Sequence, residues 1–130
     1  MIALDSNLLA RLLLRDDAVQ HARVKALLQT EQVFTAPVTV LLELVWVLQA
    51  NDCTPAEIER GMGLLLGLRN FRPPQVDAVL TALRAFAQGV DFAHALHLSL
   101  SGGDDAFMSF DKALVRKAAK LGLTPRVVLA

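Results

Sequence analysis

The sequence contains no tyrosine, a single tryptophan and a single cysteine, and its charges cancel. Because Cys53 is alone, an intramolecular disulfide is excluded and no zinc-ligand spacing is present. The 13 basic and 13 acidic residues give a formal net charge of zero. Any nucleic-acid partner must therefore be held by a local group of cations, since the chain as a whole supplies no basic field.

The chain also lacks a long uninterrupted hydrophobic run. The longest apolar stretch, residues 36–50, is too short for a bilayer and contains Glu43. The acidic Asp5 interrupts the start of the chain and no cleavage site follows, so no signal peptide is expected. We expect a soluble cytoplasmic protein with no membrane partner.

The apolar content is high instead, at 54% of 130 residues, which is enough to bury the core of one domain spanning residues 1–130. Short apolar strands alternate with helices. Strands are expected at residues 1–4, 32–36, 106–110 and 126–130, with residues 71–74 as a brief edge strand. Such strands lack polar alternation, which is typical of a buried parallel sheet. The pattern predicts an α/β fold, a three-layer α/β/α sandwich with a short, mostly parallel central sheet.

Several helices have recognisable starts and faces. Thr54, Pro55 and Glu57 form the pattern of a capping box that begins a helix. The helix over residues 38–50 is apolar nearly all round, which predicts a central position with Trp46 in the core. In the helix over residues 16–30, helical spacing relates four apolar positions, Val19, Ala22, Ala26 and Leu27.

Carboxylates follow two of the expected strands. Asp5 and Asp111 each come where a strand stops, and Asp91 begins an apolar helix after Gly89. Ligands of open α/β sheets bind at the carboxyl ends of strands, so these side chains could share one crevice. The alternative is that each aspartate simply caps a helix.

Glu43 is the only charge in its helix and has no cation at i±3 or i±4. It either faces the same crevice or lies where the helix side meets solvent. Four carboxylates converging without basic partners would repel one another unless a divalent cation neutralised them. Oxygen ligands of this kind suit Mg²⁺ or Mn²⁺.

The chain resembles PIN-domain proteins, specifically the VapC-type ribonuclease toxins of bacterial toxin–antitoxin pairs. The resemblance lies in strand-D-[ST]-N, a lone Glu in an apolar helix, D-F-A-x-A-L and [ST]-F-D, in that order along almost the whole chain. It implies that the family's acidic quartet corresponds to Asp5, Glu43, Asp91 and Asp111, as metal ligands and catalytic residues. Polar helpers correspond to Ser6, Asn7 and Ser109. Close relatives often have D-F-A-D-A-L, and this chain has His94 at the second aspartate.

The same resemblance implies hydrolysis of RNA with Mg²⁺ or Mn²⁺. Asp5 and Asp91 would make the central metal contacts, Asp111 would bind directly or through water, and Glu43 would orient or deprotonate the attacking water. His94, one turn from Asp91, could touch substrate or the outer shell of the metal. The family's toxins bind an antitoxin protein in a groove between apolar helices, and a homodimer is expected.

Local cations would hold the substrate. One stripe of cations lies on the helix that begins beside Asp111, at Lys112, Arg116 and Lys120. A second group, Arg11 and Arg15, follows Asp5 along the chain. Of these we assign Arg11, Lys112 and Arg116 to substrate binding, the alternative being a solvated helix face.

Two other functions stay open at this point. One is a catalytically weakened PIN fold that serves only as a binding module, which the His94 departure favours. The other is a receiver-like phosphoryl-acceptor domain, which would need paired acids after the first strand and a lysine on a late strand, neither of which the sequence has.

Overall fold

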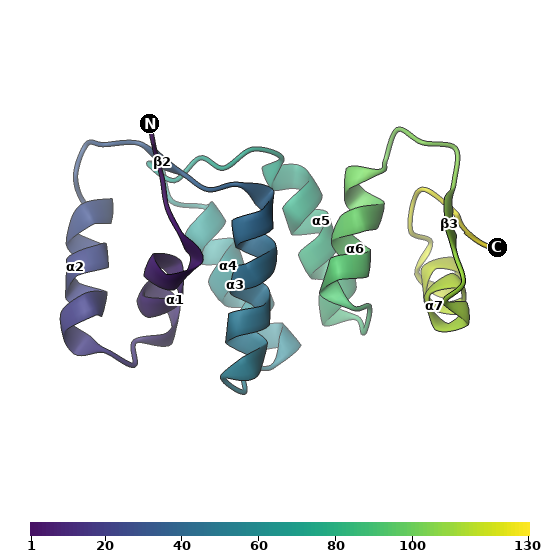
Figure 1. Cartoon of the computed structure of the whole chain (residues 1–130), viewed down its shortest axis with the longest axis horizontal. Coiled ribbons are helices and arrows are strands. Elements are labelled where there is room, and N and C mark those ends of the chain that lie inside the picture. The colour runs from purple at the N-terminus through teal and green to yellow at the C-terminus, as the bar shows by residue number, and fades with distance from the viewer. The chain divides into compact units, whose positions relative to one another are not determined.

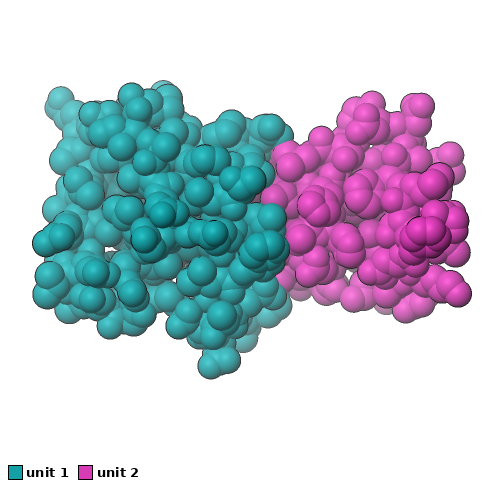
Figure 2. All heavy atoms as spheres, in the orientation of Figure 1, with its two compact units in different colours: residues 1–76 teal, residues 77–130 magenta.

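The computed structural model describes residues 1–130, which form seven helices and four short strands (Figure 1). They fall into two compact units, residues 1–76 and residues 77–130, which Figure 2 colours separately. The α/β fold with short parallel strands predicted from the sequence is confirmed. None of the helices combines the length and apolarity needed to cross a lipid bilayer.

The first unit consists of four helices around a pair of parallel strands. Strand β1 pairs with β2 in the register Ile2↔Phe34, and Phe34 also bridges Phe71 in parallel. The expected edge strand at residues 71–74 is thus reduced to a single bridge. Helix α1 packs against α2 and α3, and α3 contacts α4. The elements are β1 (Ile2–Ala3), α1 (Ser6–Leu14), α2 (Ala18–Leu28), β2 (Phe34–Thr35), α3 (Val38–Ala50) and α4 (Pro55–Leu66).

The second unit places three helices with a second parallel pair of strands. Strand β3 pairs with β4 over three residues, from Phe107↔Val127 to Ser109↔Leu129. Helix α7 contacts both strands. Its end is sharp because Gly122 adopts a left-handed conformation with φ 65°. The elements are α5 (Val76–Ala87), which begins one residue before the boundary, α6 (Phe92–Leu100), β3 (Phe107–Ser109), α7 (Lys112–Leu121) and β4 (Val127–Leu129).

Five helices, α1, α2, α4, α6 and α7, begin at a residue whose side chain caps them. The capping box at α4 is present in full: Glu57 N–H donates to Thr54 Oγ1 at 3.2 Å, and Thr54 N–H donates to Glu57 Oε1 at 2.9 Å. The three aspartates discussed above all cap helices, Asp5 at α1, Asp91 at α6 and Asp111 at α7. The capping interpretation of these residues is therefore correct, and it fixes where their carboxylates lie.

The predicted position of Trp46 is wrong. Trp46 is not in the core, since 51% of it is exposed, and α3 buries only Leu41, Leu44, Val45 and Leu48. A helix that is apolar nearly all round gives no periodic signal for the side that packs. The helix predicted from the spacing of Val19, Ala22, Ala26 and Leu27 is present as α2, with these four positions exposed and Val24 buried.

Candidate functional site

In the first unit, a buried serine joins two exposed carboxylates. Asp5 follows β1 and caps α1, with its Oδ1 accepting a hydrogen bond from Ser6 N–H at 2.7 Å. The Ser6 hydroxyl donates to Glu43 Oε1 and lies 3.5 Å from Asp5 Oδ1. Ser6 is 6% exposed and is the one buried polar side chain of the protein. Asp5 and Glu43, far apart in the sequence, are thus held on either side of one hydroxyl.

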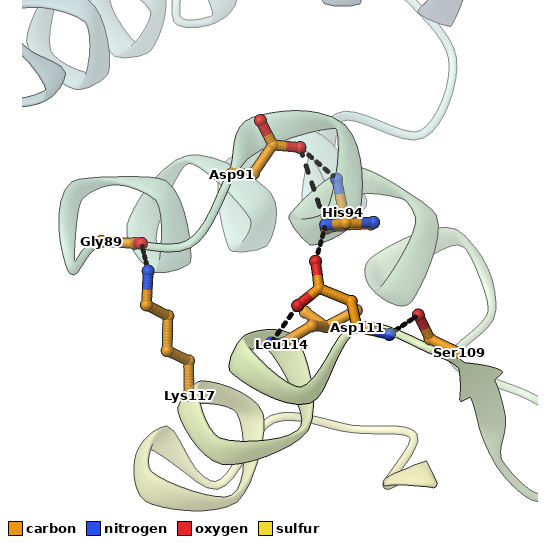
Figure 3. Close-up of polar contacts among 7 residues, drawn as sticks. All are labelled: Gly89, Asp91, His94, Ser109, Asp111, Leu114 and Lys117. Atoms are coloured by element: carbon orange, nitrogen blue, oxygen red, sulfur yellow. Dashed lines mark hydrogen bonds and ion pairs between the residues drawn. The ribbon is translucent and has the colours of Figure 1, made fainter. Parts of the chain in front are cut away.

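In the second unit, an imidazole stands between two carboxylates (Figure 3). His94 Nδ1 lies 3.8 Å from Asp91 Oδ2 and 4.0 Å from Asp111 Oδ2. Asp91 Oδ2 also accepts the backbone N–H of His94 at 3.1 Å, which is the cap of α6. The loop before α6 and the loop after β3 therefore bring Asp91 and Asp111 to the same ring.

Two hydrogen bonds fix Asp111, one through its backbone and one through its carboxylate. Its backbone N–H donates to Ser109 Oγ at 3.0 Å, and its Oδ1 accepts from Leu114 N–H at 3.0 Å. The backbone hydrogen bond from Leu114 is the main reason that the pKa of Asp111 is lowered, with smaller contributions from Ala113 N–H and from the nearby His94 and Lys117 charges. Asp111 therefore stays ionised at neutral pH, with Oδ2 directed towards His94 (Figure 3).

A lysine fixes the segment that leads into Asp91. Lys117 Nζ donates to the carbonyl oxygen of Gly89 at 2.8 Å, which ties α7 to the turn before α6 (Figure 3). Gly89 has φ 105°, a conformation that a side chain would strain. The hydrogen bond from Lys117 thus links the turn before Asp91 to helix α7, the helix that Asp111 caps.

The four carboxylates share an electrostatic property. None of them has a lysine or arginine nitrogen within 4.0 Å. The nearby charges of opposite sign around Asp111 are those of His94 and Lys117. In neither unit are three His, Cys, Asp or Glu side chains arranged so that they could hold a metal ion. Each pair nevertheless brings together carboxylate oxygens, the ligands that a hard divalent cation such as Mg²⁺ or Mn²⁺ prefers.

The predicted polar helpers have different positions. Ser6 and Ser109 contact the carboxylate-bearing residues directly, as described above. Asn7 is exposed and lines a pocket of about 320 Å³ between α1 and α2 with Arg11, Gln20 and Arg23. Arg11 also forms an ion pair with Asp16 at 2.8 Å. The pocket therefore combines two arginines and two amide side chains with the apolar Leu8 and Val24.

The predicted cationic stripe on α7 is exposed along its length, at Lys112, Arg116 and Lys120. It begins at the residue after Asp111, so its first cation is fixed beside that carboxylate. None of the three takes part in an ion pair. They are free to bind an anionic partner.

A separate groove of about 300 Å³ lies between α1, α2 and α4 of the first unit. Its lining is largely leucine, with cations among it: Leu12, Leu13, Arg15, Lys25, Leu28, Gln29, Leu64, Leu65 and Leu68. The side chain of Leu64 in this lining is exposed, at 71%. The apolar faces noted in the sequence are therefore not wholly used by the core.

These observations can be set beside known families. The chain matches the PIN domain family over residues 2–120, a range that runs through both units. The chain belongs to the PIN domain family. No curated protein matches it. PIN domains are generally nucleases that bind RNA and typically use a divalent metal, so this PIN domain has a nuclease-type function.

Sequence reasoning did not identify Lys117, Gln20 or Arg23. Lys117 lies one position after Arg116 and so falls outside the i, i+4 stripe that drew attention to its neighbours. Arg23 lies on α2, for which the sequence predicted a helix but no packing face. Its only sequence signal was its spacing of i+3 from Gln20, which is too common on helix surfaces to distinguish a binding site.

Proposed function

We propose that this PIN domain is a metal-dependent endoribonuclease acting in the cytoplasm as the toxin of a VapBC-type toxin–antitoxin pair. The proposed metal ligands and catalytic residues are Asp5, Glu43, Asp91 and Asp111. The observation that carries the proposal is the pairing of these acids, Asp5 with Glu43 through Ser6 and Asp91 with Asp111 through His94, with no lysine or arginine nitrogen within 4.0 Å of any of them. Acids held together in this way are stabilised when a dication joins them.

The proposed roles of the residues are those that the family resemblance implies. When bound, Mg²⁺ or Mn²⁺ would lower the pKa of a coordinated water and stabilise charge on the attacked phosphate. Asp5 and Asp91 would make the central contacts, and Asp111 would bind directly or through water. Glu43 would orient the attacking water or take its proton. Ser6 holds Glu43 against Asp5, and the Ser109 hydroxyl holds the backbone of Asp111.

Two groups of cations support RNA binding. Arg11 and Arg23 lie with Asn7 in the pocket beside the start of α1, and Lys112 and Arg116 lie on the exposed face of α7. Phosphate contacts from such residues supply affinity without reading sequence. Asn7 adds a side-chain amide that can donate to a phosphate oxygen or accept from a ribose hydroxyl.

The leucine-lined groove supports an antitoxin as the partner. An amphipathic helix can place its apolar face in such a groove, and Arg15 and Lys25 give acidic residues of that helix a partner. Inhibition would come from a basic side chain of the antitoxin placed among the acids. A homodimer through other surfaces completes the proposed assembly.

The test is cleavage of a structured RNA with and without Mg²⁺, using Asp5→Asn. Asparagine caps a helix as well as aspartate does, so the fold is preserved while one ligand charge is removed. We expect a loss of about a hundredfold or more, since each metal contact is worth several kcal/mol. Asp17→Asn is the matched control, because Asp17 caps α2 in the same unit and stands outside the proposed site. Equal rates for Asp5→Asn and wild type would refute the proposal.

The histidine at position 94, where close relatives often have aspartate, favours a second candidate function, a PIN fold that binds RNA without cutting it. Isothermal titration with Mn²⁺ separates the two functions. A nuclease gives heat that Asp5→Asn and Asp91→Asn abolish, whereas a binding-only module gives no carboxylate-dependent heat.

A further inference from the structure

We infer that the exposed ring of Phe110 is a stacking surface for a base of the RNA, and that the substrate is therefore unpaired at the nucleotide bound beside Asp111. The inference rests on the proposed function, because it places RNA at one of the proposed catalytic acids. It goes further in naming a residue that contacts a base and, with it, the class of RNA that the domain accepts.

The first observation is that Phe110 lies in solvent, unlike the other five of the six phenylalanines. Its exposed fraction is 84%, the highest among the large hydrophobic residues. Phe107 is half-buried, and its ring stacks on His97. The other four are buried, at Phe34, Phe71, Phe86 and Phe92. Single exposed apolar residues are common on protein surfaces, so the surroundings of Phe110 decide what its ring can do.

The strand that precedes Phe110 directs its side chain outward. Successive side chains of a strand point to opposite faces. In β3, Phe107 and Ser109 are half-buried, whereas Met108 between them is 67% exposed. Phe110 continues this alternation, on the exposed side with Met108. Its outward position is therefore set by the register of the strand.

The backbone on both sides of Phe110 is fixed. The carbonyl oxygen of Ser109, the last residue of β3, accepts a hydrogen bond from the backbone N–H of Ala130 at 3.0 Å. The Ser109 hydroxyl accepts the N–H of Asp111 at 3.0 Å (Figure 3). Asp111 in turn caps α7. Phe110 is thus the one residue between a paired strand and a capped helix, so stacking a base on it would cost little backbone entropy.

The neighbouring charges favour a nucleotide over an apolar protein surface as the occupant. Lys112 follows two residues after Phe110, and Arg116 lies one turn further along α7. Both are exposed and take part in no ion pair. An apolar partner offers these cations no counter-ion. A nucleotide supplies both parts, a base for the ring and a phosphate for the cations.

The base that meets this ring must be unpaired. Inside a duplex both faces of a base are covered by its neighbours, so a protein ring reaches a face only after the base has left the stack, which costs free energy. Loops, bulges and ends of RNA leave bases free, and aromatic side chains stack on bases mainly there. The substrate is therefore single-stranded at the nucleotide beside Asp111.

The experiment is fluorescence anisotropy of the full-length protein with labelled RNA in EDTA, which prevents metal-dependent cleavage during the measurement. The three probes are single-stranded oligo(U), the same strand annealed to oligo(A), and an abasic ribose-phosphate oligomer of equal length. The variants are Phe110→Ala, Phe110→Leu and Phe110→Trp. The control is Leu100→Ala, an exposed apolar residue at the end of α6 away from its cap Asp91.

We expect Phe110→Ala and Phe110→Leu to bind oligo(U) about fivefold to a hundredfold more weakly than the wild type, because both lose the aromatic face. Both variants should bind the duplex and the abasic oligomer as the wild type does. Phe110→Trp should bind oligo(U) at least as tightly as the wild type, and Leu100→Ala should bind all three probes unchanged. Circular dichroism of each variant establishes that the comparison is between folded proteins.

Three results would overturn the inference. The first is binding of oligo(U), strong or undetectable, that is the same in Phe110→Ala and the wild type. The second is an equal loss on all three probes, since the ring would then act without meeting an unpaired base. The third is a change in oligomeric state in Phe110→Ala, measured by sedimentation, with RNA binding unchanged, which assigns the surface to a second copy of the chain.

The proposed function can fail separately. A wild-type protein that binds oligo(U) through Phe110 but cleaves no RNA with Mg²⁺ or Mn²⁺ present refutes the nuclease and leaves the stacking surface in place. A wild-type protein that cleaves RNA, with binding that does not depend on Phe110, refutes the stacking surface alone.

Discussion

The hydroxyl of Ser6 donates a hydrogen bond to the carboxylate of Glu43, a residue 37 positions further along the chain. Ser6 lies in the first turn of α1, and Glu43 lies in the middle of α3. Helix α3 has no other ionisable side chain, so this contact determines where its single charge is directed. The same hydroxyl is 3.5 Å from Asp5, which makes Ser6 the link between the two acids of the first unit.

Replacing Ser6 by alanine should therefore weaken metal binding more than it weakens the fold. Loss of an orienting hydrogen bond typically costs about tenfold to a hundredfold in metal affinity or activity. Mn²⁺ calorimetry and RNA cleavage would measure the effect. Ser99→Ala is a suitable control, because the Ser99 hydroxyl bonds only to the Leu96 carbonyl of its own helix. A Ser6→Ala protein with wild-type metal affinity would exclude a positioning role for Ser6.

Lys117→Met should lower the cleavage rate without removing a ligand. The substitution breaks the 2.8 Å hydrogen bond to the Gly89 carbonyl and frees the turn that precedes Asp91. The cost in stability should be about 0.5 to 1.5 kcal/mol, as for a single hydrogen bond. Urea unfolding and single-turnover cleavage would separate the two effects. Lys117→Arg keeps a donor and should recover part of the activity, whereas equal defects in Met and Arg would argue against this interpretation.

The capping box of α4 should contribute a pH-dependent part of the stability. Hydrogen bonds from the backbone and hydroxyl of Thr54 lower the pKa of Glu57 below its ordinary value of 4.5. The folded pKa is below the unfolded one, so the contribution is complete above about pH 4.5 and is lost as the pH falls through the folded pKa. Glu57→Gln should therefore be less stable than wild type at pH 7, and the difference in stability should shrink as the pH falls through the folded pKa of Glu57.

Removing Thr54 tests the same box without a titratable group. Thr54→Ala should cost about 1 kcal/mol at neutral pH, the usual loss for a helix cap. Urea unfolding monitored by circular dichroism would measure it. Thr54 caps α4 and is distant in sequence from all four acids. RNA cleavage should therefore not change under conditions in which the variant is folded.

Arg23→Ala should weaken RNA binding and reduce its dependence on salt. Arg23 lines the pocket beside Asn7, and one lost phosphate contact on a single strand lowers the slope of log affinity against log salt by about 0.7. Fluorescence anisotropy with a single-stranded RNA at several salt concentrations would measure the slope. Arg84→Ala on α5 is the control, since Arg84 is exposed and bonds only to Thr81. Equal slopes for both variants would remove the pocket from the binding surface.

Leu64→Glu should separate inhibition from activity. Leu64 lines the groove and is 71% exposed, so a charge there disrupts an apolar partner and leaves the core unchanged. Cleavage should stay at the wild-type level, while suppression by a co-expressed antitoxin of the proposed kind should be lost. Val19→Glu, 72% exposed on α2 and outside the groove, should remain suppressible.

The sequence predicted the order of elements and the capping aspartates well, because both depend on local features. A short polar side chain before an apolar helix is a strong start signal, and Asp5, Asp91 and Asp111 all behave accordingly. The structure shows the cap for each of the three aspartates, and a role for them in a metal site stays a prediction.

Packing faces and long-range contacts were harder to predict. Trp46 was expected in the core because its helix is apolar all round, but such a helix gives no periodic signal to orient it. The contacts of Ser6 with Glu43 and of Lys117 with Gly89 join residues 37 and 28 positions apart. Nothing in local composition specifies such pairs, which depend on how helices pack within each unit.

The division of the proposed acidic quartet along the chain bears on its synthesis. Residues 1–76 contain Asp5 and Glu43, and residues 77–130 contain Asp91 and Asp111. A polypeptide emerging from a ribosome therefore carries an incomplete quartet until residue 111 has been translated. Under the proposed function, a product that ends before residue 111 lacks part of the quartet and should not cleave RNA.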